Sequence, residues 1–209
     1  LAVFCLVVLL PVMALFRVPM AGFFRTIREP ALLAFSSASS EAALPKAMQN
    51  LEVFGVPRRI VAFVLPTGYS FNLDGSTLYL AVASIFCFQA AGVELAFTDQ
   101  LLMMLMLMLT SKGVAAVPRA SLVILSGTLV SFGAYLQGKG VVQAEQLSLA
   151  LAAVGTILGV DAFMDMARTS INLVGNCLAT VVMARWEGEF NEAGISSSSA
   201  EPSQPSASR

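Results

Sequence analysis

The residues best suited to chemistry lie in one stretch near the end of the chain, Asp161-Ala-Phe-Met-Asp165-Met-Ala-Arg168-Thr169-Ser-Ile-Asn172-Leu-Val-Gly175-Asn176. A helix advances about 100° per residue, which places every strongly polar side chain of this stretch within an arc of about 100°. The members of this stripe are Asp161, Asp165, Arg168, Thr169, Asn172 and Asn176. Two carboxylates, a guanidinium and two amides on one face are suited to binding a small charged solute or an ion.

The stripe lies within an otherwise apolar run from Leu147 to Ala184, which is long enough to cross a bilayer. Each charge would cost several kcal/mol at mid-depth in lipid, so the stripe must face protein or a wet cavity. One interpretation is a structural ion-pair network between helices. A solute or ion site is favoured, because ionisable residues inside a membrane are functional candidates by default.

The composition indicates an all-α integral membrane protein. The chain has 209 residues, of which 57% are hydrophobic and 12% charged, whereas about a quarter of a soluble domain is charged. There is no histidine, which excludes a His-based zinc site or a Ser-His-Asp triad within this chain. Cys5, Cys87 and Cys177 are isolated in apolar runs and are interpreted as small buried hydrophobes. No basic tract suggests nucleic acid.

The first residues, 1–16, are uniformly apolar and fit the end of a membrane helix whose start lies upstream. No charged region precedes them, which argues against a signal peptide. Pro11 is expected to kink this helix, and Arg17 marks the membrane interface.

Residues 20–55 are predicted to form a first re-entrant hairpin. A serine cluster, Ser36 to Ser40, separates two arms that are each too short to span. Such a non-helical tip is tolerated at membrane depth only against protein or water. The alternative is an ordinary Ser-rich linker outside the membrane.

Residues 57–91 are predicted to form a broken membrane helix. Breakers and polar residues, Pro66 to Ser76, interrupt a long apolar stretch. The freed carbonyls and half-helix ends suit cation and carboxylate coordination near the midplane. In a soluble protein the same residues would indicate a turn.

Residues 100–136 are predicted to form a second re-entrant hairpin, with apolar arms at 101–109 and 122–132 around a tip of small residues. Arms of about ten residues are too short to span. Two interrupted elements, each followed by a longer helix, are typical of a secondary transporter. The last membrane helix covers 145–186, and Trp186 is an expected interfacial anchor. Residues 1–188 would thus be a partial transport domain, and 189–209 a disordered cytoplasmic tail.

The positive charges give an orientation. With the tail in the cytoplasm, the basic residues on the cytoplasmic side are Arg17, Arg25, Arg28, Lys46, Arg58, Arg59 and Arg185. Only Lys139 lies in an outer loop. One hairpin then opens inward and the other outward, which is the geometry that alternating access needs.

Four motifs in order along the chain resemble the dicarboxylate/amino acid:cation symporter family (the sodium:dicarboxylate symporter family). They are the Ser-rich hairpin, Asn-x-Asp-Gly-Ser, Ser-Lys-Gly…Val-Pro and Asp-x3-Asp-x2-Arg-Thr-x2-Asn-x2-Gly-Asn. The resemblance is to its bacterial proton/sodium-glutamate symporters and covers about residues 1–189. It implies the C-terminal, transport-core half of a glutamate-transporter-like fold. A scaffold half missing from this chain, a homotrimer and the bacterial plasma membrane are further implications, with no enzyme activity and no cofactor beyond a coupling cation, H⁺ or Na⁺.

The resemblance also implies roles for individual residues. At the substrate, Ser39 and Ser40 form the tip of the first hairpin, Val117 and Pro118 cover the site, and Ser121 lies near it. Ser76 and Arg168 hold the distal carboxylate, Asp165 binds the α-ammonium, Asp161 supports Arg168, and Thr169 and Asn172 complete the hydrogen bonds. The cation-binding positions, which would hold sodium if sodium is the coupling ion, are Gly68, Ser70, Asn72, Asp74, Ser111, Lys112, Val114, Asn172 and Asn176.

Two features bear on substrate and coupling. Plain C4-dicarboxylate carriers that resemble this chain place Ser at the position of Asp165, so the carboxylate favours glutamate or aspartate. Asn176 stands where sodium-coupled members carry Asp, and Glu41 where they carry Ser. Both resemble proton-coupled carriers, with Glu41 a candidate proton carrier. Arg119 has no assigned role.

Alternatives remain open at this point. A C4-dicarboxylate or a neutral amino acid carrier is the nearest, although Asp165 and Arg168 argue against each in turn. An intramembrane aspartyl hydrolase would pair Asp161 or Asp165 with Asp74, but Arg168 would keep both acids ionised. The last alternative is that this piece of chain does nothing alone.

Overall fold

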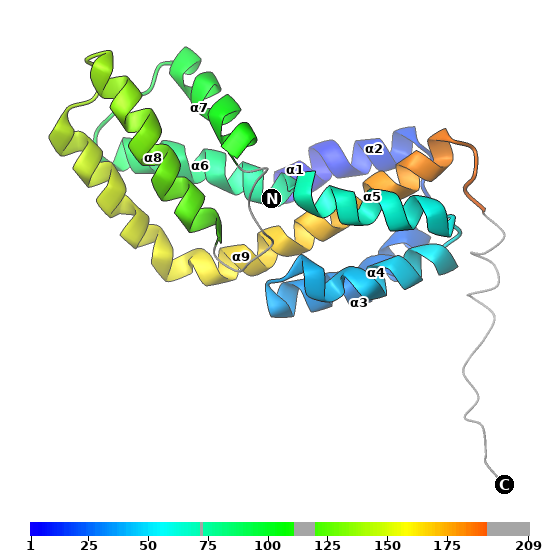
Figure 1. Ribbon diagram of the computed structural model, residues 1–209. Helices are drawn as coiled ribbons and strands as arrows, with labels where there is room; N and C mark the ends of the chain where they lie inside the picture. The colour runs from blue at the N-terminus through cyan, green and yellow to red at the C-terminus, as the bar shows by residue number, and fades with distance from the viewer. Residues whose placement is uncertain (72, 111–119, 192–209) are drawn as a thin grey trace, which may run out of the picture.

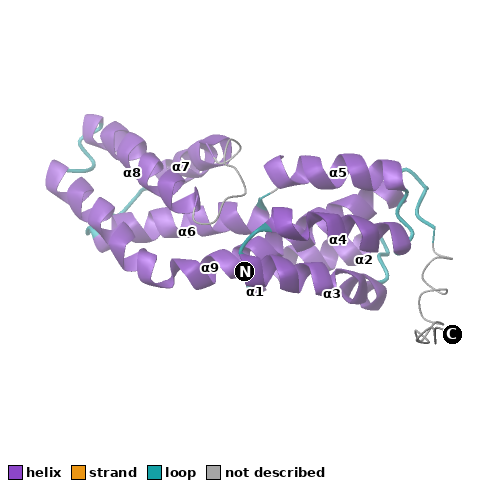
Figure 2. Ribbon diagram, turned by 60° about the horizontal axis from the view of Figure 1, so that its bottom comes forward, coloured by secondary structure: helices purple, strands orange, loops and turns teal. Residues whose placement is uncertain are grey.

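The computed structural model describes residues 1–71, 73–110 and 120–191. Within those ranges every regular element is a helix (Figure 2). By length and composition, three helical stretches could cross a membrane: Arg58–Ala90, Ser121–Gly138 and Ala144–Trp186. The all-helical membrane architecture expected from the composition is therefore confirmed.

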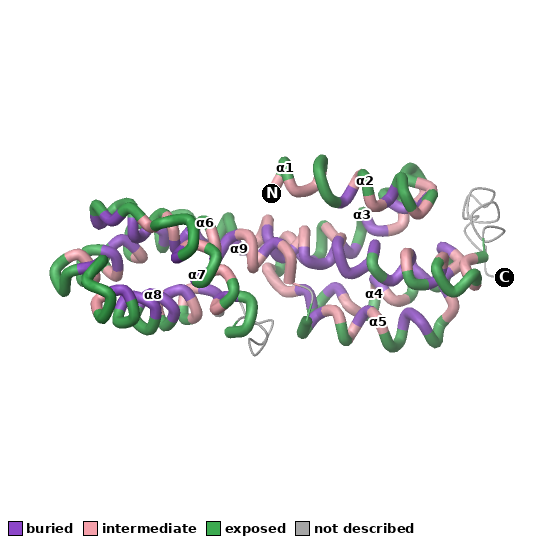
Figure 3. The backbone as a smooth tube through the Cα atoms, turned by 90° about the horizontal axis from the view of Figure 1, so that it is seen from above, coloured by how far each residue is buried: buried purple, intermediate pink, exposed green. Residues whose placement is uncertain are grey.

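One helix, α9 (Ala144–Trp186, 43 residues), runs through the whole molecule (Figure 1). A capping box begins it, in which the side chains of Gln143 and Gln146 each bond the other's backbone N–H. Buried positions follow it from end to end, and the other helices pack along it (Figure 3). α9 takes part in two separate hydrophobic cores, one at each end.

The first core surrounds the second half of α9. It is built by α1 (Ala2–Phe4), η1 (Cys5–Leu9), α2 (Leu10–Leu15), α3 (Met20–Ser37), α4 (Ser40–Val53) and α5 (Arg58–Phe71). On α3 the buried residues Phe23, Ile27, Pro30 and Ala34 recur at helical spacing, so one face of α3 packs inward. Within the first helix, the expected distortion near Pro11 takes the form of the π-helical turn η1.

The second core surrounds the first half of α9. It is built by α6 (Asp74–Ala90), α7 (Phe97–Thr110) and α8 (Ala120–Gly138). Phe88 and Phe132 pack edge to face across it, with ring centroids 6.3 Å apart. Leu107 and Leu125 are fully buried in the same core.

The helix α8 is longer than the sequence-based estimate of an arm from 122 to 132. It has 19 residues, and its length alone would suffice to cross a membrane, so the argument that both arms of this hairpin are too short was wrong for α8. Gly127 and Gly133 do not end the helix, because a helix-interior glycine costs only about 1 kcal/mol. A Cβ on Gly133 would lie 2.3 Å from the Leu147 side chain, so a larger residue there would require Leu147 to change its rotamer.

The two helical hairpins open at opposite ends of α9. The α3–α4 hairpin and α5 meet at Gly55, whose carbonyl accepts a 2.9 Å hydrogen bond from the backbone N–H of Asn191, just after α9. The α7–α8 hairpin opens beside the start of α9, where Lys139 donates a 2.7 Å hydrogen bond to Asp99.

Candidate functional site

The polar stripe of α9 lies at the junction of the two cores, opposite the break between α5 and α6. Two glycines permit this close approach. A Cβ on Gly68 would lie 2.2 Å from Oδ1 of Asn176, and a Cβ on Gly75 would lie 2.6 Å from the carbonyl oxygen of Arg168. A side chain at Gly75 would collide with main-chain atoms, whereas one at Gly68 would force the Asn176 side chain to move.

The structure buries the whole stripe. Its members are at most 7% exposed: Asp161, Asp165, Arg168, Thr169, Asn172 and Asn176. Because buried charges are costly unless they are paired, the contacts among these residues decide what the site can bind.

Arg168 forms an ion triad with two carboxylates of its own helix. Its Nη1 lies 3.2 Å from Oδ1 of Asp161, and its Nη2 lies 2.8 Å from Oδ1 of Asp165. The second oxygen of Asp161 is buried and has no hydrogen-bond partner among the described residues. With both carboxylates ionised, the triad carries a net charge of −1.

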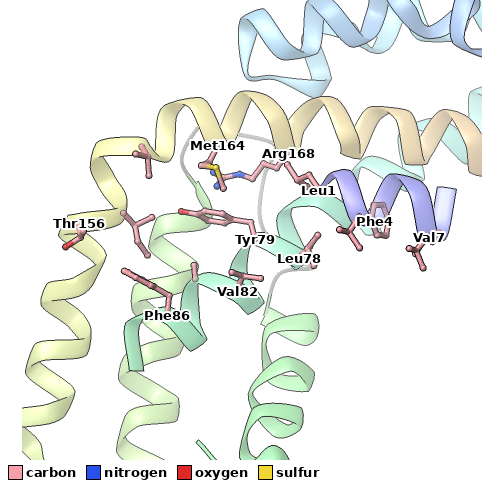
Figure 4. Close-up of a pocket in the computed structure, with 15 residues that line it drawn as sticks. Leu1, Phe4, Val7, Leu78, Tyr79, Val82, Phe86, Thr156, Met164 and Arg168 are labelled. Atoms are coloured by element: carbon pink, nitrogen blue, oxygen red, sulfur yellow. The ribbon is translucent and has the colours of Figure 1, made fainter. Parts of the chain in front are cut away.

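Tyr79 of α6 completes this cluster, and the sequence analysis did not identify it. Its hydroxyl donates a 2.8 Å hydrogen bond to Oδ1 of Asp161, and the Arg168 guanidinium carbon lies 4.2 Å from its ring centroid. Figure 4 shows the Tyr79 ring beside the Arg168 side chain. The sequence did offer one indication of this role. Tyr79 lies within an apolar helix, and a buried tyrosine hydroxyl needs a hydrogen-bond partner.

Asn172 joins the stripe to the broken helix. Its Oδ1 accepts hydrogen bonds from the backbone N–H of Gly75 at 2.7 Å and of Ser76 at 3.3 Å, and its Nδ2 donates to Oγ of Ser76 at 2.9 Å. The first free N–H groups of α6 are thus capped by a side chain from another helix. Ser76 and Asn172, both expected at the substrate, are in direct contact.

The first hairpin lies alongside the stripe. Oγ of Ser170 donates a 3.2 Å hydrogen bond to the carbonyl of Ala31, and the rings of Phe35 and Phe163 are 6.2 Å apart. The later residue of α3, Phe35, contacts the earlier residue of α9, Phe163, so the two helices are antiparallel. The tip of the hairpin, which follows α3, therefore points toward the first half of α9.

At the tip itself, Ala38 has a φ of 48°, and Ser39 caps α4 by accepting a 3.4 Å hydrogen bond from the backbone N–H of Ala42. Ser40 is buried, whereas Glu41 is exposed. The hydrogen bonds of Ser39 to Ser37 and Ala42 stay within the tip, so its contact with substrate remains a prediction.

The remaining expected site residues are less closely connected. Ser121 is buried at the start of α8, Asp74 is half-buried at the start of α6, and Ser70 is exposed. The expected residues outside the described ranges are Asn72, Ser111, Lys112, Val114, Val117 and Pro118, together with Arg119. Among the described residues, no group of three His, Cys, Asp or Glu side chains is arranged to hold a metal ion.

A cavity of about 780 Å³ lies between the first helix, α6 and α9 (Figure 4). Its lining is mostly aliphatic and aromatic, including Phe4, Val82 and Phe86, with Tyr79 and Arg168 among its few polar members. Asp165 and Asn172 do not line it. The cavity is therefore too apolar to hold a zwitterion, and the polar side of the stripe is the better candidate.

Comparison with known proteins, like the geometry of the site, points to a transporter of small charged solutes. Residues 1–186 match the model of the sodium:dicarboxylate symporter family. The chain is 43% identical over 189 residues to the proton/sodium-glutamate symport protein of Geobacillus stearothermophilus, covering 90% of this chain. It is 44% identical over 188 residues to the proton/glutamate-aspartate symporter of Escherichia coli, again covering 90% of this chain. It is also 43% identical over 172 residues, or 82% of this chain, to the C4-dicarboxylate transport protein 2 of Mesorhizobium japonicum.

The chain spans about 40% of the length of these relatives: 41% of the first, 40% of the second and 36% of the third. The family consists of secondary transporters, which overturns the hydrolase alternative. With a family model that covers nearly all of the described residues, and with three membrane-length helices, the chain is part of a multi-pass membrane protein and belongs to the sodium:dicarboxylate symporter family.

Proposed function

We propose that this chain is the transport core of a symporter that carries glutamate or aspartate together with a cation, with protons favoured over sodium. The supporting observation is the buried triad of Asp161, Asp165 and Arg168, in which one guanidinium lies between two carboxylates. Relatives of similar identity are named as glutamate, glutamate-aspartate or C4-dicarboxylate carriers.

The charge of the triad supports an amino acid over a bare dicarboxylate. Glutamate brings a net charge of −1 to a site that already carries −1, and its ammonium offers a partner for Asp165. Succinate would bring −2 and no cation. Because each uncompensated charge at membrane depth costs several kcal/mol, Asp165 disfavours the dicarboxylate.

The same charge balance supports cation coupling. Binding of an anionic substrate raises the negative charge of a buried site, and a cation that enters with the substrate offsets it. Arg168 is suited to the distal carboxylate, since its planar fork matches a carboxylate in two parallel hydrogen bonds. Ser76 and Asn172 supply neutral hydrogen-bonding groups beside it.

Proton coupling is supported by the residues at the proposed cation site. Asn176 lies against Gly68 and brings no charge, which weakens a sodium site relative to one with a carboxylate. Glu41, exposed at the hairpin tip, is the proposed proton carrier. Amide and backbone oxygens of Gly68, Ser70, Asn72, Asp74 and their partners would form any sodium site.

The proposal includes the membrane arrangement. The α3–α4 and α7–α8 hairpins would be re-entrant from opposite faces of the bacterial plasma membrane, on either side of a broken α5–α6 span. Alternating exposure of the site would follow from opening one hairpin or the other. A scaffold half and a homotrimer would complete the assembly.

The test is uptake by the full-length protein in proteoliposomes. Unlabelled aspartate is expected to displace labelled glutamate far better than succinate does. Asp165→Ser should lose glutamate uptake and gain succinate uptake, whereas Glu145→Ser, which removes the same charge from the exposed first turn of α9, should leave both unchanged. Equal displacement by succinate and aspartate in the unaltered protein would refute the amino acid assignment.

A C4-dicarboxylate symporter is the second candidate, favoured by the 43% identity to the Mesorhizobium japonicum protein. The coupling ion is decided separately. Uptake driven by a sodium gradient without any pH gradient would reject proton coupling, and uptake driven by an inside-alkaline pH gradient without sodium is expected.

A further inference from the structure

The start of α3 and the end of α9 lie at the same end of the molecule. Three aromatic rings connect them: Phe23 lies 6.3 Å from Phe54, and Phe54 lies 5.4 Å from Phe190. Trp186, the last residue of α9, is 77% exposed at this end. Exposed tryptophans are enriched at the membrane–water interface, so this end is at headgroup level.

Among the described residues at this end, up to Asn191, each acidic side chain is paired with a basic one. Glu29 pairs with Lys46 at 3.1 Å, and Glu52 pairs with Arg58 at 4.0 Å. Arg59 pairs with both acids that follow α9, Glu187 and Glu189. Most of these pairs are solvent-exposed and contribute little stability, but they occupy the acids of residues 1–71 and 187–191 at this end.

Three arginines at this end remain without an acidic partner among the described residues. Arg17, Arg25 and Arg28 are all exposed, and none takes part in an ion pair within those ranges. Arg17 lies in the turn between α2 and α3, and Arg25 and Arg28 lie on the first half of α3. We name this set of residues, together with Met20 and Phe24, the α2–α3 corner.

The corner combines positive charge with exposed apolar side chains. Arg17 has a φ of 51° in the turn, which brings the chain around into α3. On α3, Met20, Phe24 and Arg28 follow one another at four-residue intervals and so share one face, with Arg25 beside them. Phe23 and Ile27 occupy the buried face, so Met20, Phe24 and Arg28 are directed away from the core.

We infer that the α2–α3 corner binds the headgroup of an anionic phospholipid. The guanidinium groups would hold the lipid phosphate, which arginine contacts through two parallel hydrogen bonds. Met20 and Phe24 would insert among the first acyl carbons. The complementary charge selects an anionic lipid over a zwitterionic one, and the exposed apolar residues at headgroup level select a lipid over a soluble anion.

The inference is tested by native mass spectrometry of the full-length protein in detergent, titrated with phosphatidylglycerol or phosphatidylcholine. Each arginine near an anionic surface is worth about fivefold in affinity. The triple variant Arg17→Gln/Arg25→Gln/Arg28→Gln should therefore bind phosphatidylglycerol about a hundredfold more weakly, with phosphatidylcholine unchanged. Because these side chains are exposed, the variant is expected to fold, which circular dichroism verifies.

A matched control removes the same charge from paired bases at the same end, in Lys46→Gln/Arg58→Gln/Arg59→Gln. It should weaken phosphatidylglycerol binding by less than fivefold. Equal losses in both triple variants would mean a general charge effect and would overturn the inference, as would equal affinity for the two lipids in the unaltered protein.

Two further arms separate a lipid from a free anion. Phe24→Ser should weaken phosphatidylglycerol binding several-fold, and inorganic phosphate at the same concentration should not displace the lipid. Displacement by phosphate, or no effect of Phe24→Ser, would refute lipid recognition. None of these readouts depends on transport, so they are independent of the proposed function.

Discussion

The α-carbon of Gly75, in the first turn of α6, lies against the backbone of Arg168 on α9. A Cβ added to Gly75 would be 2.6 Å from the Arg168 carbonyl oxygen and 3.1 Å from its Cα. Both obstructing atoms belong to the main chain, so neither can move aside as a flexible side chain would. The missing side chain at Gly75 therefore allows the broken helix to pack closely against the turn of α9 that carries the ion triad.

Replacement of Gly75 by alanine is therefore expected to lower stability by about 1–3 kcal/mol, the usual cost of overpacking, and to impair transport. Thermal unfolding in detergent measures the loss of stability. Gly127→Ala is the control, since a Cβ at Gly127 meets nothing within 4 Å, and it should stabilise α8 by about 0.5–1 kcal/mol. Equal effects of the two substitutions would contradict this account.

Tyr79 is expected to position Asp161 and Arg168 for substrate. Tyr79→Phe keeps the ring over the guanidinium but removes the hydrogen bond to Asp161, which should weaken apparent glutamate affinity about tenfold, the value of a hydrogen bond to a charged group. Tyr79→Leu removes the ring as well and should weaken the apparent glutamate affinity further. Uptake kinetics distinguish the two, with the exposed Tyr135 changed to Phe as control. An unaltered KM in both Tyr79 variants would exclude a positioning role.

Asn176 is expected to decide the coupling ion. Asn176→Asp adds a negative charge beside Gly68, and uptake should then become stimulated by sodium at constant pH. Uptake in proteoliposomes with and without sodium is the measurement. Ser148→Asp adds the same charge to an exposed part of α9 and should bring no sodium dependence. If sodium stimulates both variants equally, the position of the charge is irrelevant and the prediction is wrong.

The pair of Lys139 and Asp99 is expected to stabilise the opening of the second hairpin in a pH-dependent way. The hydrogen bond to Asp99 raises the pKa of Lys139 above its ordinary value. A raised pKa means that the contribution is fully present below about pH 10.4 and is lost as the pH rises through the raised pKa. Thermal unfolding between pH 8 and 11.5 should show this loss in the unaltered protein and not in Lys139→Met. Parallel curves for the two proteins would disprove it.

The arrangement of residues along α9 could be predicted from the sequence, because helical periodicity is a local property. The spacing of Asp161, Asp165 and Arg168 is sufficient to place them on one face and to require that this face be buried. The interruption expected from Pro66 to Ser76 was too long, because α5 continues through Pro66 and Gly68 to Phe71 and α6 begins at Asp74.

Contacts between distant elements could not be predicted in the same way. Tyr79 and Asp161 are 82 positions apart, and nothing in either neighbourhood specifies the partner. Asn172 was expected at a ligand, yet its oxygen caps α6, a role that depends on where two helices meet. The length of α8 was underestimated because its arm was taken to be the apolar run 122–132, whereas the helix continues to Gly138.

The first residues of the expected tail also take part in the fold. The Phe190 ring packs between Phe54 and the guanidinium of Arg185, whose Cζ is 4.6 Å from the ring centroid. A Cβ on Gly55, which has a φ of 108°, would collide with the backbone of Asn191. These contacts depend on packing between distant segments and leave no periodic pattern in the sequence.

The helix α9 belongs to both hydrophobic cores without a loop between them. Each bundle therefore packs on its own half of one continuous helix. The turns that carry Asp161, Asp165 and Arg168 lie between these two halves. A twist of one bundle relative to the other that is transmitted through α9 would therefore strain these turns and alter the spacing of the three charges.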